Sequence, residues 1–426
     1  MTEPRFEKVT LDNGITLVAE SYSHVRSVCI GAWIRAGSAL ETDSQAGLSH
    51  FIEHMAFKGT ARRSSLEIAT VLESLGGELN AFTDRETTCF HATVLKEHLE
   101  LALDVLSDVV FYPAYPDSEV EREKKVILQE LSMIQESPDD WIGDLFLEQV
   151  WPGGGLGRPV IGHAQSIRRV SKAAMLRFFE RHYRPESILI SVAGNIEFPM
   201  LREACERYFG RVPRGRGAVV AKRVKPRYRA FSKKVSLDSE QAHLMVGFEG
   251  VGLRETDRFN ALILSFFLGG GMSSRLFQEI REKQGLAYTV ECDCVAYRDA
   301  GLFTVYAGVT PKALEKCLAI IGRELIRLTE TPLAERDLEL VKGQLRGTIL
   351  LSSDQMEVRQ ESLGRNEQLF GRYVPVKEVI AQIEAVTPDG IQRLARRLFR
   401  PEKESVLALG NLRGWPSRLR VLESGS

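Results

Sequence analysis

The stretch GLSHFIEHMAFKGT, residues 47–60, decides how the chain is interpreted. It places His50 and His54 four residues apart, with Glu53 directly before the second histidine. If residues 47–57 form a helix, both imidazoles lie on one face, one turn apart, and can bind a single Zn²⁺. Glu53 borders the same face, where its carboxylate can take a proton from a water held by the metal. The pattern predicts a zinc-dependent hydrolase.

The apolar neighbours of this motif argue against a plain surface helix. A histidine pair on a helix is often structural, and five residues can match by accident in a chain with eight histidines. Here Phe51, Met55 and Phe57 would bury the helix, and a buried His–Glu–His cluster without a metal would be hard to satisfy. We therefore favour the metal-binding interpretation.

A hydrolytic zinc site also needs a third protein ligand, and residues 117–134 offer candidates. The pattern of this segment predicts an amphipathic helix with Ser118 as its N-cap. Glu130 lies within the run VILQEL, which is an unusual setting for a carboxylate, and Glu123 lies two turns before it on one face. Glu121 is better explained as a solvated carboxylate.

Residues 47–60 resemble the catalytic segment of the pitrilysin family, the inverzincin peptidases, whose motif reverses the commoner His-Glu-x-x-His order. The resemblance is closest to the β subunit of mitochondrial processing peptidase and its bacterial relatives. In that family a distal Glu, within an ERE…VILxE sequence, completes the zinc site. The resemblance thus implies Glu130 as the third ligand, Glu123 as the acidic residue that supports the site, and one Zn²⁺ per chain.

Two further stretches resemble the same family. GGELNAFT, residues 76–83, resembles the strand that lines its cleft, which implies that Asn80 and Ala81 bind a peptide substrate by main-chain pairing. REKQGLAY, in the second half, resembles a segment whose Arg and Tyr reach the substrate carbonyl. Those two residues are Arg281 and Tyr288 here. An ordinary helix end followed by a turn is the alternative for this pair.

The second half of the chain looks like a diverged copy of the first. HATVLKEHLELALDVL, residues 91–106, aligns with YAGVTPKALEKCLAII, residues 306–321. We expect an α+β protein of two homologous domains, each an antiparallel-type sheet with helices on one side. The resemblance implies that they form a clamshell around a central chamber. The domains are predicted at residues 1–215 and 234–426, joined by a basic linker at 216–233.

The metal-binding residues do not recur in the copy. The aligned positions of the motif and of the distal Glu hold Leu264, Phe267, Leu268 and Gln344. The second domain is therefore predicted to lack a zinc site.

Local patterns predict several elements around the motif. Asp-Asn-Gly at residues 12–14, between two strand-like runs, predicts a hairpin. Residues 64–75 and 96–110 have helical patterns, and residues 80–94 have the composition of one strand rich in Thr and Phe.

Composition argues against several classes of protein. The chain has 56 basic and 57 acidic residues, so its net charge of −1 gives no reason to expect nucleic acid or a membrane as a partner. No apolar stretch approaches the roughly 18 residues of a membrane span. Six scattered cysteines suit free thiols in a reducing compartment. No secretory signal is visible, and the Met1 start favours a bacterial cytoplasmic enzyme over a mature enzyme of an organellar matrix.

Three functions are compatible with these features. The first is a zinc endopeptidase that hydrolyses short or unfolded peptides in an enclosed chamber. The second is a non-catalytic structural or assembly subunit of the same family, although retention of all three ligands and the base argues against it. The third is a subunit that is active only with a partner chain. Arg281 and Tyr288 on the same chain favour a self-sufficient enzyme, expected as a homodimer.

Overall fold

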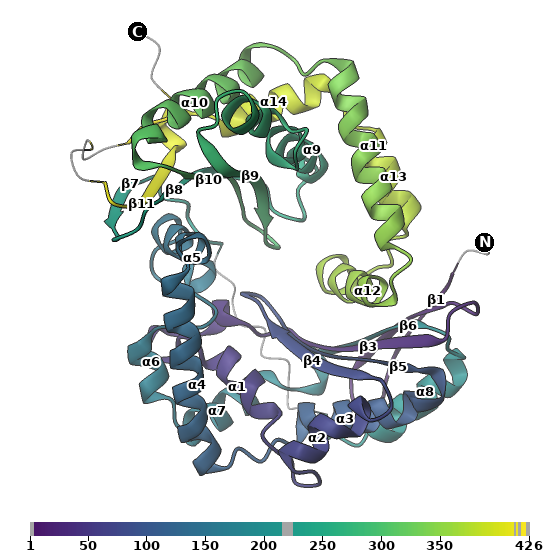
Figure 1. The fold of residues 1–426 in the computed structure, drawn as a ribbon. Helices are drawn as coiled ribbons and strands as arrows, with labels where there is room; N and C mark the ends of the chain where they lie inside the picture. Colours follow the sequence, from purple (N-terminus) through teal and green to yellow (C-terminus); the bar gives the residue numbers. More distant parts are fainter. Residues whose placement is uncertain (1–3, 215–224, 413–414, 416–418, 423–426) are drawn as a thin grey trace. The chain divides into compact units, whose positions relative to one another are not determined.

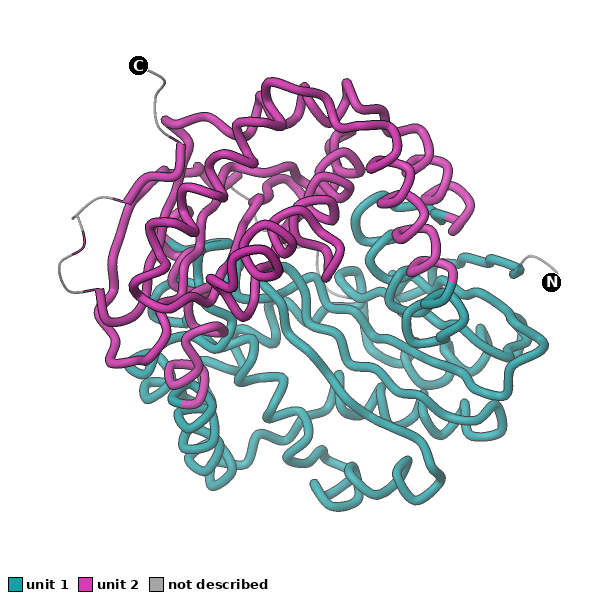
Figure 2. Tube along the Cα trace, turned by 45° about the horizontal axis from the view of Figure 1, so that its top comes forward, with its two compact units in different colours: residues 1–132, 154–224, 351–374 teal, residues 133–153, 225–350, 375–426 magenta. Residues whose placement is uncertain are grey.

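The computed structural model describes residues 4–214, 225–412, 415 and 419–422. The chain divides into two compact units, which Figure 2 distinguishes by colour. Unit 1 comprises Met1–Ser132, Gly154–Val224 and Leu351–Val374, and unit 2 comprises Met133–Gly153, Lys225–Leu350 and Pro375–Ser426. Each unit is thus assembled from three separate segments. The predicted domain limits stay a prediction, and residues 216–224 of the predicted linker lie outside the described residues.

Unit 1 holds a six-stranded sheet in the order β1-β2-β6-β3-β5-β4. The strands are β1 (Arg5–Thr10), β2 (Thr16–Ser21), β3 (Ser27–Ile34), β4 (Glu78–Thr83), β5 (Thr88–Leu95) and β6 (Ile188–Gly194). β2 and β6 are parallel, and the other neighbours are antiparallel. β4 is the last strand, so one of its sides carries unpaired main-chain groups.

The hairpin predicted around residues 12–14 is confirmed as β1 and β2. Gly14 adopts a φ of 97°, which a side chain would disfavour. The Asn13 amide donates to the carbonyl oxygens of Phe209 and Val212, at 2.9 and 3.1 Å. The turn is therefore fixed both by its own conformation and by the end of a distant helix.

The single strand predicted at residues 80–94 is wrong, because the chain turns in its middle. The Asp84 carboxylate accepts the backbone N–H groups of Glu86 and Thr87, both at 2.7 Å. The Asp84 N–H donates to the Thr87 carbonyl at 2.8 Å. Such a side-chain turn needs neither Gly nor Pro. It pairs Thr83 with Thr88 and makes β4 and β5 an antiparallel hairpin.

Helices cover both faces of this sheet. The helices that lie wholly or mostly in unit 1 are α1 (Leu48–Ala56), α2 (Ser65–Glu73), α3 (Leu99–Phe111), α4 (Asp117–Glu136), α6 (Ala164–Arg169), α7 (Lys172–His182), α8 (Phe198–Tyr208) and α12 (Met356–Phe370). In Figure 1, α1, α3 and α8 lie on one face and α12 lies on the other. The zinc motif lies in α1 and therefore on the face of the sheet that α1, α3 and α8 share.

The predicted N-cap of α4 is wrong. The helix begins at Asp117, so Ser118 lies inside its first turn. The Val120 N–H donates to the carbonyl of Pro116 at 3.0 Å, which starts the helical bonding pattern two residues before Ser118.

The helix α12 comes from the second half of the chain and packs tightly on unit 1. A side chain at Gly31 would overlap Gln360, and one at Gly364 would overlap Trp33. The Trp33 indole N–H and the Gln360 amide both donate to the Ser191 hydroxyl, at 2.8 and 2.7 Å. The two glycines thus permit a close approach that buries Trp33 completely.

Unit 2 holds a five-stranded sheet in the order β7-β11-β8-β10-β9. Its strands are β7 (Ser232–Ser236), β8 (Ala242–Glu249), β9 (Ala287–Ala296), β10 (Gly301–Val309) and β11 (Ser405–Gly410). Its helices are α5 (Pro138–Val150), α9 (Arg258–Gly269), α10 (Leu314–Glu330), α11 (Glu335–Ser352), α13 (Val376–Glu384) and α14 (Pro388–Leu398). The helix α5, from the first half of the chain, packs against β8 and β11.

The repeat predicted from the sequence appears as matching elements. β5 followed by α3 in unit 1 corresponds to β10 followed by α10 in unit 2. The shared central order, β6-β3-β5-β4 against β11-β8-β10-β9, extends the correspondence to four strands of each sheet.

Within the described residues, no helix combines the length and the apolar character needed to cross a bilayer. All six cysteines are free thiols, and five of them are buried.

Candidate zinc centre

The helix α1 carries the motif, as the sequence predicts. Its residues Phe51, Ile52 and Met55 are fully buried, which fixes the helix against the sheet and leaves the histidine face toward α4. The preceding Gly47 has a φ of 88°, and a side chain there would lie 2.4 Å from the Ile161 carbonyl oxygen. Only glycine allows the chain to enter the helix along this path.

Glu41 caps the N-terminus of α1. Its two carboxylate oxygens accept the backbone N–H groups of Gly47 and Ser49, at 2.8 and 2.6 Å. The Arg158 guanidinium donates to the Glu41 carbonyl at 2.5 Å and pairs with Asp43 at 2.8 Å. A carboxylate at this end satisfies donors that a helix leaves free and complements the helix dipole. Glu41 thus orients the helix that carries the motif.

Burial of Glu41 predicts a pH-dependent stability. Desolvation raises its pKa from 4.5 to about 7, although the backbone donors and Arg158 oppose that rise. Between these values the native carboxyl keeps a proton that the unfolded chain has released, so rising pH favours unfolding. We expect this group to remove about 3 kcal/mol of stability as the pH rises from 4.5 through 7.

Urea unfolding of the wild type and of Glu41→Gln across this pH range measures the effect. The amide does not titrate, so the difference between the two curves isolates Glu41 from the histidines that titrate in the same range. The prediction fails if the two pH profiles run parallel.

Three side chains converge where the sequence predicts metal ligands. The Nε2 atoms of His50 and His54 lie 3.2 Å apart, and a carboxylate oxygen of Glu130 lies 3.8 Å from the His54 Nε2. One ligand atom from each residue falls within 4.8 Å of the others. Within the part of the chain that the structure describes, this is the group of His, Cys, Asp and Glu residues that could hold a metal.

The donor set suits a small divalent cation. Burial, together with the neighbouring His54, lowers the pKa of His50 to about 4, so the His50 imidazole is neutral at pH 7. Two imidazole nitrogens and a carboxylate that converge on one point, with Glu130 partly exposed at 37%, leave room for a further ligand. Two nitrogens and an oxygen with an open position fit the ligand preferences of catalytic Zn²⁺.

Glu123 lies behind His54. Its Oε1 is 2.8 Å from the His54 Nδ1, its Oε2 is 2.8 Å from the Lys58 Nζ, and its side chain is only 2% exposed. Because a carboxylate accepts the Nδ1–H, the Nε2 of His54 is left with its lone pair. The hydrogen bond to His54 and the Lys58 ammonium hold the pKa of Glu123 below its usual value against the effect of burial.

Glu53 lies beside the ligands without belonging to the cluster. Its carboxylate accepts a hydrogen bond from the Thr83 hydroxyl of β4 at 2.5 Å. Burial raises the pKa of Glu53, and the Thr83 hydroxyl opposes that rise. A buried carboxylate with a raised pKa, held by one donor, is suited to accept a proton.

Asn80 and Ala81 lie in β4, the edge strand. The Asn80 amide oxygen accepts the Ala81 N–H at 2.8 Å. The strand that would pair with a peptide is therefore joined to the motif helix through Thr83, whose side chain lies on the same strand.

Arg281 and Tyr288 lie in unit 2 and contact each other. Arg281 donates to the Tyr288 carbonyl at 2.7 Å, and its guanidinium carbon lies 4.9 Å from the centre of the Tyr288 ring. The same carbon lies 4.7 Å from the centre of the Phe277 ring. The Tyr288 side chain is 73% exposed, so the phenol is available to a ligand.

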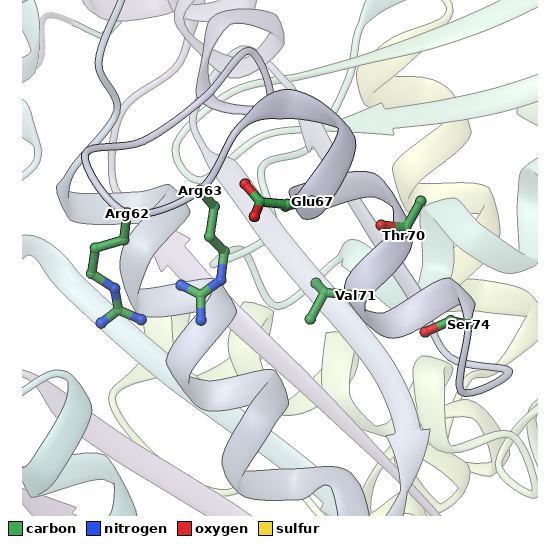
Figure 3. A pocket seen from close by; sticks show the side chains of 6 residues that line it. All are labelled: Arg62, Arg63, Glu67, Thr70, Val71 and Ser74. Atoms are coloured by element: carbon green, nitrogen blue, oxygen red, sulfur yellow. The ribbon is translucent and has the colours of Figure 1, made fainter.

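A pocket of about 450 Å³ is lined by none of the candidate site residues. Its lining residues, shown in Figure 3, are Arg62, Arg63, Glu67, Thr70, Val71 and Ser74. Asp104 and Asp108 pair with the two arginines at 2.6 Å. Because both positive charges are neutralised, the pocket offers no strong site for an anion.

Three residues that contact the site were assigned no role from the sequence. They are Glu41, Lys58 and Thr83. Lys58 and Thr83 lie at the polar ends of the two quoted segments, where the sequence gives no signal of a contact with the site. Glu41 gives no distinctive signal either, since an acidic residue before a helix is common.

Two family models match the chain. Residues 16–164 match the model described as insulinase (peptidase family M16). Residues 169–345 match the model described as the M16 inactive domain. The chain belongs to peptidase family M16. The resemblance found in the sequence is confirmed at this level.

Relatives that align with nearly the whole of this chain support its assignment to family M16. An uncharacterized zinc protease of Bacillus subtilis, YmxG, is 36% identical over 394 residues, 92% of this chain and 95% of that protein. An uncharacterized zinc protease of Mycobacterium tuberculosis is 36% identical over 420 residues, 97% of this chain and 96% of that protein.

Solved structures support the fold. A protease from Helicobacter pylori has a TM-score of 0.90 at 19% identity, covering 96% of this chain and all of that one. A Pseudomonas fluorescens structure described as a peptidase M16 inactive domain has a TM-score of 0.89 at 18% identity and covers 95% of this chain and 98% of that one. The predicted α+β class with two homologous domains is confirmed.

Proposed function

We propose that this M16 protein is a zinc-dependent endopeptidase that hydrolyses short or unfolded peptides. The observation that carries the proposal is the convergence of His50, His54 and Glu130 within 4.8 Å. The carboxylate of Glu53 lies close enough to interact electrostatically with His54 and Glu130 but outside the ligand set. The relatives described as zinc proteases support the same reaction class.

Each residue of the centre has a role that follows from its contacts. His54 donates its Nδ1–H to Glu123 and so presents its Nε2, while neutral His50 presents its own. Glu53 takes the proton of the attacking water, which its buried position and raised pKa favour. When bound, zinc supplies Lewis acidity toward water and the substrate carbonyl.

The peptide substrate is proposed to bind along β4. An extended peptide can add to this edge through main-chain hydrogen bonds, with Asn80 and Ala81 next to the scissile bond. Arg281 and Tyr288 are proposed to stabilise the developing oxyanion, a role that suits a guanidinium and an exposed phenol. The family resemblance supports both roles, and it supports an enclosed chamber as the place of reaction.

Several finer features belong to the same proposal. They are a special closeness to the β subunit of mitochondrial processing peptidase, one Zn²⁺ per chain, a homodimer, and a bacterial cytoplasmic location. A non-catalytic structural or assembly subunit is the alternative function. The match of residues 169–345 to a model described as inactive is compatible with it, so the test must separate binding from catalysis.

Metal removal and restoration test this function. We expect the purified protein to contain about one zinc per chain, to lose hydrolysis of an unstructured peptide on chelation, and to regain it with Zn²⁺. His54→Ala is expected to abolish both zinc binding and hydrolysis. His24→Ala changes an exposed histidine outside the cluster and serves as the matched control.

The possible outcomes distinguish the alternatives. Failure to bind zinc after reconstitution rules out the site. Zinc binding without hydrolysis of any unstructured peptide favours the non-catalytic subunit.

A further inference from the structure

Lys58 lies in the turn directly after α1 and contacts Glu123. We propose that Lys58 is a positioning residue for the zinc centre, which acts by holding the Glu123 carboxylate against His54. This inference rests on the proposed zinc site and adds a residue to it. Lys58 touches neither the candidate ligands nor the base in the contacts described above, so its effect must pass through Glu123.

The two oxygens of the Glu123 carboxylate contact different partners. Its Oε1 faces the His54 Nδ1 at 2.8 Å, and its Oε2 faces the Lys58 Nζ at 2.8 Å. With the side chain 2% exposed, water cannot replace a missing partner easily. A carboxylate with a hydrogen-bond partner at one oxygen and an ion-pair partner at the other keeps one orientation, and it therefore fixes the ring of His54.

The backbone of Lys58 is itself well anchored. The Lys58 N–H donates to the Met55 carbonyl at 3.2 Å, and the Gly59 carbonyl accepts the Ala114 N–H at 2.9 Å. The Thr60 hydroxyl donates to the buried Asp108 carboxylate at 2.8 Å. These contacts tie the turn after α1 to the segment that leads into α4. Lys58 therefore links the helix that carries the histidines to the helix that carries Glu123 and Glu130.

Lys58 has two opposing effects on a bound cation. Its positive charge repels the metal, while its contact with Glu123 keeps His54 oriented toward it. The Lys58 side chain is 30% exposed, so water and salt weaken its long-range field. Its contact with the carboxylate is direct and buried, where electrostatic interactions are stronger. We infer that the orienting effect dominates and that loss of Lys58 weakens zinc binding.

The test is the zinc affinity of the full-length apoprotein, measured with Zn²⁺ alone in competition with a chromophoric chelator. Lys58→Met is expected to weaken binding about 10-fold, the lower end of what outer partners of metal ligands contribute. Lys58→Arg keeps a donor and a charge and is expected to retain most of the affinity. Lys96→Met removes a lysine from an exposed pair with Glu197 and is expected to change nothing.

A double-variant cycle shows whether Lys58 acts through Glu123. In the Glu123→Gln background, Lys58→Met is expected to cause no further loss of zinc affinity. Lys58→Leu, which also removes the ammonium group and offers no donor, guards against a Lys58→Met protein that fails to fold. Thermal melting of each apoprotein checks that the compared variants are folded.

Three results would overturn the inference. They are wild-type affinity in folded Lys58→Met or Lys58→Leu, tighter binding in either, or a full second loss in the Glu123→Gln background. If the wild type binds no zinc and His54→Ala behaves in the same way, both the proposed function and this inference fail. If the wild type binds zinc and the Lys58 variants match it, the inference alone fails.

Discussion

Glu53→Gln is expected to lower kcat/KM on an unstructured peptide by about 10²- to 10⁴-fold, the usual contribution of a positioned general base. An amide has the shape of the carboxylate but cannot take the proton of water. The Thr83 hydroxyl can donate to the amide oxygen as it does to the carboxylate, so the side chain should keep its place. Because Glu53 lies outside the ligand cluster, the zinc content should be unchanged.

Steady-state kinetics and metal analysis on the same preparation measure kcat/KM and the zinc content. Glu121→Gln makes the same chemical change at a carboxylate on α4 that is 71% exposed, and it should leave both unchanged. Full activity in Glu53→Gln would refute the assignment of the base. Loss of zinc together with activity would instead mean that Glu53 supports the metal site.

The cluster of His50, His54 and Glu130 was predictable because its signals are local or nearly so. His50 and His54 lie one helical turn apart, so the sequence spacing alone places both imidazoles on one face. Glu130 could be chosen from its apolar surroundings together with the resemblance to a family. The structure brings all three within 4.8 Å.

The hairpin of β4 and β5 was not predictable by the same rules. Gly and Pro are absent between Thr83 and Thr88, and the turn is made by the side chain of a single Asp84. The segments on both sides of the polar run TDRETT, residues 83–88, have strand-like compositions rich in Thr and Phe, which favours one continuous strand. The missed turn mattered for the site, because it places Thr83 at the end of β4, next to Glu53.

Contacts between side chains that are distant in the sequence also could not be predicted from it. Lys58 and Glu123 are far apart in the chain, and no spacing rule reveals that their charges meet at 2.8 Å. The packing of α12 on the sheet of unit 1 is a similar case. An amphipathic pattern shows that a helix has a buried face, but it does not show which sheet that face will meet.

Removal of one partner of the ion pair that holds α12 is expected to have a large effect on the stability of unit 1. Glu20 of β2 is fully buried, and its carboxylate pairs with the Arg359 guanidinium through both oxygens. The hydroxyl groups of Tyr22 and Tyr373 donate to the same carboxylate. Arg359→Met removes the balancing charge and leaves a buried carboxylate, which we expect to cost about 3–5 kcal/mol in the free energy of unfolding.

A second substitution separates the cost of an unpaired charge from the value of the pair. Glu20→Leu combined with Arg359→Met replaces both charges by apolar groups, and it should recover most of the loss, because desolvation offsets most of the attraction in a buried pair. Arg207→Met breaks an exposed pair with Glu100 and should cost less than about 1 kcal/mol. Urea unfolding followed by circular dichroism measures the free energy of unfolding of all three variants. A double variant as unstable as Arg359→Met would show that the pair itself, rather than the unpaired Glu20, sets the stability of this packing.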